Sequence, residues 1–217
     1  MKFGQAEEPA AEPPTPSLNA QRLTAVEAEL VASGAARVLD LGCGEGHRLK
    51  PLLASAQFRE VLGMDVSPRE LKRAERYLRL DELPPTVRVR LTLIQGSLTY
   101  RDARLRGYDA AALVEVIEHL DEGRLWTLER VVFGDARPGT VVVTTPNAEY
   151  NARYAFLGEG EAHHQDHCFE WNRETFQGWA TRVGETFGYG VTFRPVGEED
   201  PALGSPTQMA VFARKSP

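Results

Sequence analysis

The sequence has 217 residues, of which 42% are hydrophobic and 26% are charged, and its formal net charge is −6. This length and composition are typical of one soluble globular domain, and no apolar run is long enough for a membrane-spanning helix. The acidic balance argues against a protein that coats long nucleic acids, but it is compatible with one that holds a short terminus. With no signal peptide and only two cysteines, Cys43 and Cys168, we expect a cytoplasmic protein.

Residues 1–17 are rich in Pro, Ala and Glu and are predicted to be a disordered linker or tail, whereas residues 18–217 are predicted to fold. Helices are predicted over 18–33, 47–56, 69–79, 118–133 and 175–187. Strands are predicted over 37–41, 60–66, 87–95, 108–116, 140–145, 191–196 and 208–215. Their alternation predicts a doubly wound α/β domain with a mostly parallel, seven-stranded sheet.

The clearest motif is a glycine-rich turn between the first predicted strand and the next helix. It reads Asp40-x-Gly42-x-Gly44-x-Gly46, whereas the dinucleotide-binding fingerprint has two residues between its last two glycines. The glycines let the backbone turn sharply and approach a ligand closely. This spacing resembles motif I of the class I S-adenosylmethionine-dependent methyltransferases, which have a Rossmann-like fold, and the resemblance implies that Asp40 contacts the methionine end of the cofactor.

Two further strand ends complete the predicted cofactor site. Asp65 ends the second strand, about 20 residues after the glycine turn, where an acid binds the ribose hydroxyls of adenosine. Ser97 and Leu98 follow the third strand, in the loop that borders the adenine in this fold class. Asp40 and Asp65 are also residues that commonly cap loops, but their offsets favour cofactor binding.

After the fourth strand, Glu115, Glu118 and His119 are spaced so that one helical turn brings them to a common face. Two carboxylates and an imidazole suit Mg²⁺, Mn²⁺ or Fe²⁺. An ordinary helix start, with acids near its N-terminus, explains the same pattern equally well. The segment 148–172 adds His163, His164 and His167, and a loop of this length is more often functional than filler and is a source of a fourth ligand.

Several motifs together resemble the RNA 3′-terminal ribose 2′-O-methyltransferases, a family of eukaryotic small-RNA methyltransferases and a bacterial RNA-repair methyltransferase. The resemblance runs through nearly the whole chain from Leu18, and its most specific part is Asp166-His-x-Phe-Glu-Trp-x-Arg173. The other matching segments are Gln21-Arg22, Gly96 to Asp102, Glu115 to Leu120, Val132 to Gly134, Thr144 to Asn151 and Pro206-Thr207-Gln208.

The resemblance implies that Glu115, Glu118, His119 and His167 bind one divalent metal ion, Mn²⁺ or Mg²⁺, which takes the vicinal 2′ and 3′ hydroxyls of the terminal ribose. His163 and His164 then remain candidates for RNA contact. A bound cation lowers the pKa of a ribose hydroxyl and orients it toward the sulfonium methyl group. An RNA 3′ end with both hydroxyls free is therefore the expected substrate, and the general base is left open between His119, His163 and water.

Two other functions fit part of the pattern. A catechol- or quinone-biosynthesis-type O-methyltransferase shares the glycine turn and often the Glu-x-x-Glu-His element, but it lacks the segment from Asp166 to Arg173. A non-catalytic, cofactor-binding subunit is disfavoured by the intact candidate site. Bacterial relatives carry an upstream domain that assembles with polynucleotide kinase-phosphatase, so we expect this chain to be the methyltransferase half of a longer protein.

Overall fold

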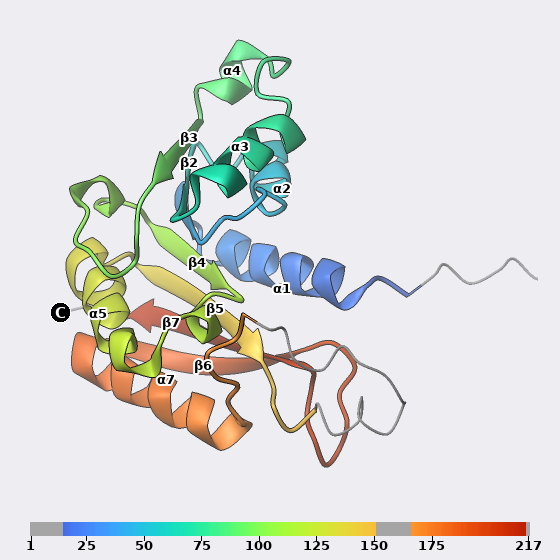
Figure 1. Ribbon diagram of the computed structural model, residues 1–217, viewed down its shortest axis with the longest axis vertical. Helices are drawn as coiled ribbons and strands as arrows, with labels where there is room; N and C mark the ends of the chain where they lie inside the picture. The colour runs from blue at the N-terminus through green and yellow to red at the C-terminus, as the bar shows by residue number, and fades with distance from the viewer. Residues whose placement is uncertain (1–14, 151–165, 216–217) are drawn as a thin grey trace, which may run out of the picture.

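The computed structural model describes residues 15–150 and 166–215, which form one seven-stranded sheet with helices on both faces (Figure 1). The strands are β1 (Arg37–Leu41), β2 (Glu60–Asp65), β3 (Leu91–Gln95), β4 (Ala110–Val114), β5 (Thr140–Pro146), β6 (Tyr189–Val196) and β7 (Thr207–Arg214). Their order across the sheet is β3-β2-β1-β4-β5-β7-β6, and β7 runs antiparallel to both of its neighbours. The predicted α/β fold with a mostly parallel sheet is confirmed.

Helices cover the two faces of the sheet in separate groups. The α-helices are α1 (Leu18–Ala32), α2 (Leu49–Ala54), α3 (Pro68–Tyr77), α4 (Pro85–Arg88), α5 (Leu125–Glu129) and α7 (Arg173–Phe187). Short 3₁₀ helices are η1 (Ala103–Leu105), η2 (Ile117–His119) and η3 (Glu122–Arg124), and α5 continues into the π-helix η4 (Arg130–Ala136). Leu30, Leu52 and Leu71 of α1 to α3 pack in one apolar cluster, and Leu128 of α5 and Phe176 of α7 pack in the other.

Side-chain caps explain where three of the helices begin. Ser17 Oγ accepts a hydrogen bond from the backbone N–H of Ala20, so α1 begins at Leu18. Ser67 caps α3 in the same way, with Pro68 as the first helical residue, as the Ser-Pro pair predicts. Asn172 caps α7, which therefore begins two residues before the predicted start.

Two of the predicted elements are wrong in their extent. The expected strand over 87–95 begins with the helical turn α4, because two consecutive prolines, Pro84 and Pro85, set up a helix start, and only Leu91–Gln95 pairs with β2. The expected continuous helix over 118–133 is broken into η2, η3, α5 and η4. The first break lies at Leu120 and Asp121, whose ψ angles of 145° and 133° are extended and separate η2 from η3.

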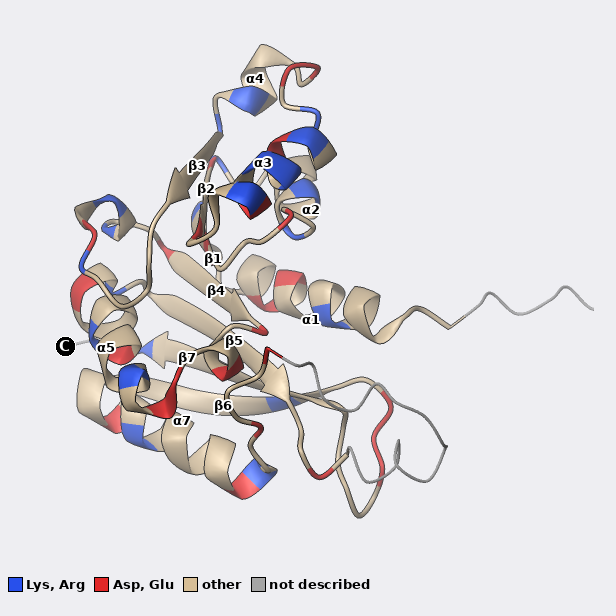
Figure 2. Cartoon of the chain, viewed as in Figure 1, with Lys and Arg blue, Asp and Glu red and all other residues tan. Residues whose placement is uncertain are grey.

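Basic side chains on α3 face the solvent (Figure 2). Arg73 pairs there with Glu45 and Glu70 at 3.0 and 3.1 Å. This pairing is typical of a solvated, mixed-charge helix face. Within residues 15–150 and 166–215, no helix combines the length and the apolar character needed to cross a membrane.

Candidate active site

The glycine-rich turn lies between β1 and α2, at the carboxyl end of the central strand. Gly42, Gly44 and Gly46 have φ angles of +74°, +50° and +82°, a region that favours glycine. A Cβ on Gly42 would also lie 2.6 Å from a methyl group of Val116. Asp65 Oδ2 accepts a hydrogen bond from the N–H of Gly44 at 2.9 Å, so the turn is held against the end of β2.

A cavity of about 450 Å³ opens beside this turn. Its lining includes five of the predicted cofactor-binding residues, Gly42, Gly44, Asp65, Ser97 and Leu98, and two of the predicted metal ligands, Glu115 and His119. The cavity is large enough for a nucleoside-sized ligand, and its two ends carry different chemistry. Near the ends of β2 and β3 the lining carries the carboxylate of Asp65 and the hydroxyl of Ser97. Near the end of β4 it carries Glu115 and His119.

Asp40 lies behind the glycine turn and is fully buried. Its Oδ1 accepts from Arg48 Nε at 2.7 Å, and Arg48 Nη2 donates to the carbonyl oxygen of Gly42 at 2.8 Å. Burial raises the pKa of Asp40, and the Arg48 charge opposes that rise. In this structure Asp40 thus holds the turn through Arg48, and its direct contact with a cofactor stays a prediction, as does that of Gly46.

The second half of the site gathers Glu118, His119 and His167. One candidate ligand atom from each of these residues lies within 4.8 Å of the others. Glu118 and His119 belong to η2, directly after β4, and His167 comes from the segment before α7. The sequence-predicted ligands from these two distant segments therefore do meet, although no single helical turn presents them.

Backbone hydrogen bonds hold the two segments together. The N–H of Cys168 donates to the carbonyl oxygen of Glu118 at 2.7 Å, and His119 Nδ1 lies 3.1 Å from the carbonyl oxygen of Asp166. His167 Nδ1 lies 3.0 Å from the carboxylate of Glu170. Since a carbonyl and a carboxylate accept, each histidine donates from Nδ1, which makes Nε2 the ring nitrogen through which it would bind a metal. A carboxylate behind a histidine in this way is typical of metal-binding imidazoles.

Burial of Glu118 disfavours the ionised form of its carboxyl group. It is fully buried, and its pKa is raised to about 8, first by desolvation and then by the nearby charge of Glu115. Thr145 donates to its Oε2 at 3.1 Å, while its Oε1 has no hydrogen-bond partner within the described part of the chain. A buried carboxylate with an unsatisfied oxygen is expensive unless a cation or a proton compensates it.

Glu115 stands apart from the group of three ligands that the structure brings together. Thr144 donates to its Oε1 at 2.9 Å, and Arg22 Nη2 lies 3.1 Å from its Oε2. Burial raises the pKa of Glu115, and the charge of Arg22 opposes the rise. Whether Glu115 completes a metal site as the fourth ligand stays a prediction. His163 and His164 lie outside the described residues.

Comparison with known proteins identifies the family. A family model described as a methyltransferase domain matches residues 39–141. The crystal structure of the methyltransferase domain of bacterial CtHen1 is 51% identical to this chain, with a TM-score of 0.85, and the match covers 91% of this chain and all of that domain. This chain belongs to the Hen1 methyltransferase family. The predicted resemblance and the class I S-adenosylmethionine-dependent fold are both confirmed.

Curated relatives of this Hen1 domain are named small RNA 2′-O-methyltransferases. The Rattus norvegicus protein is 37% identical over 82% of this chain and 46% of its own length, and the Gallus gallus protein is 36% identical over 94% and 55%. The chain thus spans about half the length of these relatives. The crystal structure of the small RNA methyltransferase HEN1 is 30% identical, with a TM-score of 0.81, over all of this chain and 28% of that one.

The structure adds one side chain to the site that residue-by-residue reasoning missed. Arg22 of α1 donates to Thr207 Oγ1 of β7 at 2.9 Å and pairs with Glu115, so it ties the N-terminal helix to the chemical end of the cavity. In the sequence, Arg22 is noted only as part of the Gln21-Arg22 segment that resembles the Hen1 family. A lone arginine on an amphipathic helix gives no signal by itself, because its partners are far away in the sequence.

Proposed function

We propose that this domain transfers a methyl group from S-adenosylmethionine to the 2′-hydroxyl of the 3′-terminal ribose of RNA, with a divalent cation held by Glu118, His119 and His167 and by Glu115. The observation that carries the proposal is the meeting of the first three side chains, one of which, His119, lines the cavity that the glycine turn borders. The names of the curated relatives support the same substrate and position.

The residues present fit a cation. Glu118 offers a buried oxygen that lacks a partner among residues 15–150 and 166–215, and the two histidines use Nδ1 for their hydrogen bonds to Asp166 and Glu170, so Nε2 is the nitrogen that each would offer to a cation. Carboxylate and imidazole ligands without a thiolate suit Mn²⁺ or Mg²⁺. A cation bound there supplies Lewis-acid chemistry, lowering the pKa of a hydroxyl that is otherwise a poor nucleophile.

The side chains of this chain perform the remaining tasks. Asp65 presents carboxylate oxygens at the β2 end of the cavity, where they accept hydrogen bonds from the adenosine ribose. Glu115 and His119 line the opposite end, where the acceptor hydroxyl is to be positioned. Arg22 and Thr144 fix the orientation of the Glu115 carboxylate, so the acceptor hydroxyl meets a carboxylate that is already held in place.

The decisive experiment measures transfer of a labelled methyl group to RNA, DNA and catechol, with Mn²⁺, with Mg²⁺ and with a chelator. We expect methylation only of RNA with free 2′ and 3′ hydroxyls, and only with a cation. RNA ending in a 2′-deoxy, 3′-deoxy or 3′-phosphate nucleotide should be inert. Full activity on a 3′-deoxy end would refute recognition of both hydroxyls, and activity on catechol alone would favour the small-molecule reaction.

We further propose that the modified ends arise in RNA repair, together with polynucleotide kinase-phosphatase bound by another part of the full-length protein. This rests on the resemblance to the bacterial family members. A chain in the structure titled the Pnkp1/Rnl/Hen1 RNA repair complex has a TM-score of 0.69, but at 20% identity its likeness concerns the fold alone. Co-purification of the full-length protein with a kinase-phosphatase tests the proposal, and a full-length protein that never binds one would refute it.

A further inference from the structure

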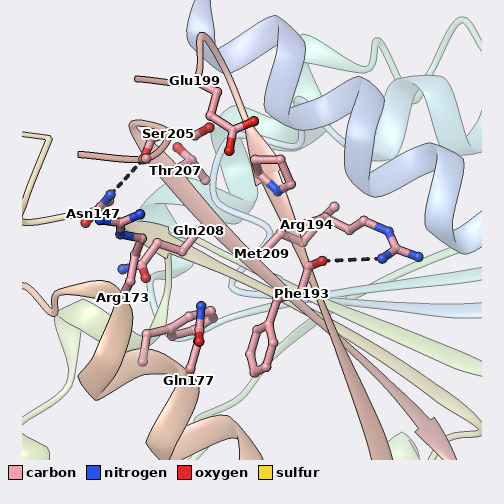
Figure 3. A pocket seen from close by; sticks show the side chains of 13 residues that line it. Asn147, Arg173, Gln177, Phe193, Arg194, Glu199, Ser205, Thr207, Gln208 and Met209 are labelled. Carbon is pink, nitrogen blue, oxygen red and sulfur yellow. Dashed lines mark hydrogen bonds between the residues drawn. The ribbon is translucent and has the colours of Figure 1, made fainter. Parts of the chain in front are cut away.

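A second cavity, of about 210 Å³, lies where α7, the ends of β6 and β7 and the segment 197–206 meet (Figure 3). Three segments of the Hen1 resemblance contribute to its wall: Asn147 from the end of β5, Arg173 from the start of α7, and Thr207-Gln208 from the start of β7. The candidate metal ligands are not among its lining residues. These motif residues therefore require an explanation of their own.

Two buried oxygens in the wall have no hydrogen-bond partner in the described residues. One is Gln208 Oε1 and the other is Ser205 Oγ, and their residues are only 7% and 5% exposed. The orientation of the Gln208 amide is fixed, because its Nε2 donates to the carbonyl oxygens of Pro146 and Trp171 at 3.1 and 2.9 Å. Oε1 is therefore an acceptor without a donor, and such a group destabilises the fold unless a ligand or water satisfies it.

Both arginines that line this cavity are already paired with carboxylates, and the third charged side chain of the lining is the acid Glu199. Arg173 donates from Nε and Nη2 to the carboxylate of Glu149 at 2.8 and 2.6 Å, and Arg194 pairs with Glu29 at 3.3 Å. An anionic ligand such as a phosphate would have to compete with these carboxylates. A neutral ligand that donates hydrogen bonds fits the wall better.

Part of the remaining surface is flat or apolar. Phe193, which is half-buried, lines one side and packs edge-on against Phe176, which is only 1% exposed. The backbone of Gly204 lies close to the Arg173 side chain. A Cβ at position 204 would be only 3.0 to 3.3 Å from Arg173 side-chain atoms. Aromatic rings and guanidinium planes are the surfaces on which proteins stack the unpaired bases of RNA. The volume also far exceeds the roughly 10–15 Å³ that a single water needs.

This cavity is one strand away from the candidate metal site. Gln208 of β7 pairs with Thr145 of β5, whose hydroxyl donates to Glu118. Paired residues of antiparallel strands point to the same face and lie about 5 Å apart. A ligand at Gln208 is therefore next to the site proposed to hold the terminal ribose.

We propose that this cavity is a nucleobase subsite, which takes one of the two 3′-terminal bases of the RNA and prefers a base with an amino group that donates to Gln208 and Ser205. The inference rests on the proposed function, since it assigns the cavity to the same RNA strand. It makes the recognition of the RNA end depend on a base as well as on the ribose hydroxyls.

The test combines Ser205→Ala with short RNAs that carry an abasic ribose at the last, second-last or third-last position. Ser205→Ala removes only an unpartnered hydroxyl, so its melting temperature should equal or exceed that of the unsubstituted protein. Thr92→Ala, on the opposite edge strand β3, is the matched control. RNA affinity is measured by fluorescence anisotropy with S-adenosylhomocysteine present, and KM is measured for methyl transfer.

We expect Ser205→Ala to weaken binding of intact RNA about three- to tenfold, the loss of one hydrogen bond to a ligand. One abasic position should weaken binding to the unsubstituted protein, and that penalty should shrink in Ser205→Ala. Equal affinities for all RNAs in both proteins, as expected for a cavity filled by ordered water only, would overturn the inference, and so would strictly additive penalties. Because affinity is measured without turnover, absence of methyl transfer would count against the proposed function and not against the subsite.

Discussion

The buried carboxyl group of Glu118 should make the metal-free protein lose stability as the pH rises. Its pKa is about 8 in the folded protein against an ordinary value of 4.5. Because the folded-state pKa is raised, the unfolded chain releases this proton first, so the folded state is favoured below 4.5 and disfavoured progressively up to 8. Integrated from about pH 5 to about pH 8, this one group should lower the free energy of unfolding by about 3 kcal/mol.

Glu118→Gln is the matched variant, because it keeps the shape of the side chain and removes its titration. Urea unfolding of both proteins with a chelator gives the difference in the free energy of unfolding at each pH, in which the contributions of groups other than Glu118 and the neighbouring Glu115 cancel. This difference should shift by about 3 kcal/mol in favour of the variant between about pH 5 and about pH 8. Mn²⁺ should then restore the stability of the unsubstituted protein alone. A difference that does not change with pH would refute this account of Glu118.

Three substitutions test other parts of the site. Asp65→Ala removes the acceptor for the N–H groups of Gly44 and Ser67 as well as the expected ribose contact, so calorimetry should show S-adenosylhomocysteine binding weakened about 10- to 100-fold. Arg22→Met leaves the buried Glu115 carboxylate without its guanidinium, and it should lower the free energy of unfolding by about 3 kcal/mol and reduce kcat while the cofactor affinity stays unchanged. His167→Ala should abolish cation-dependent turnover with the cofactor affinity intact, and retained turnover would show that His167 is not a ligand.

The fold was predictable because its signals are local and redundant. Buried parallel strands such as Val61–Met64 are continuous apolar runs, and Ser67-Pro68 marks a helix start wherever it occurs. The strand expected from residue 87 failed because Val87 and Val89 have strand-forming side chains, whereas the preceding proline pair favours a helical turn. Where two local signals disagree in this way, the position of an element's end depends on tertiary contacts.

At the chemical end of the site, three of the predicted ligands lie together, but through a backbone geometry that differs from the expected one. Helical periodicity was expected to bring Glu115, Glu118 and His119 together, but Glu115 adopts a left-handed conformation and its N–H donates to the carbonyl oxygen of Thr144 on the next strand. Its side chain pairs with Arg22, which lies 93 residues earlier in the sequence. A non-glycine residue in this conformation costs about 1–3 kcal/mol and persists only when its surroundings hold it. That strain, together with the buried carboxyl group of Glu118, is what we expect if this end of the sheet is arranged for binding at the expense of stability, and the Glu118→Gln measurement tests that trade-off directly.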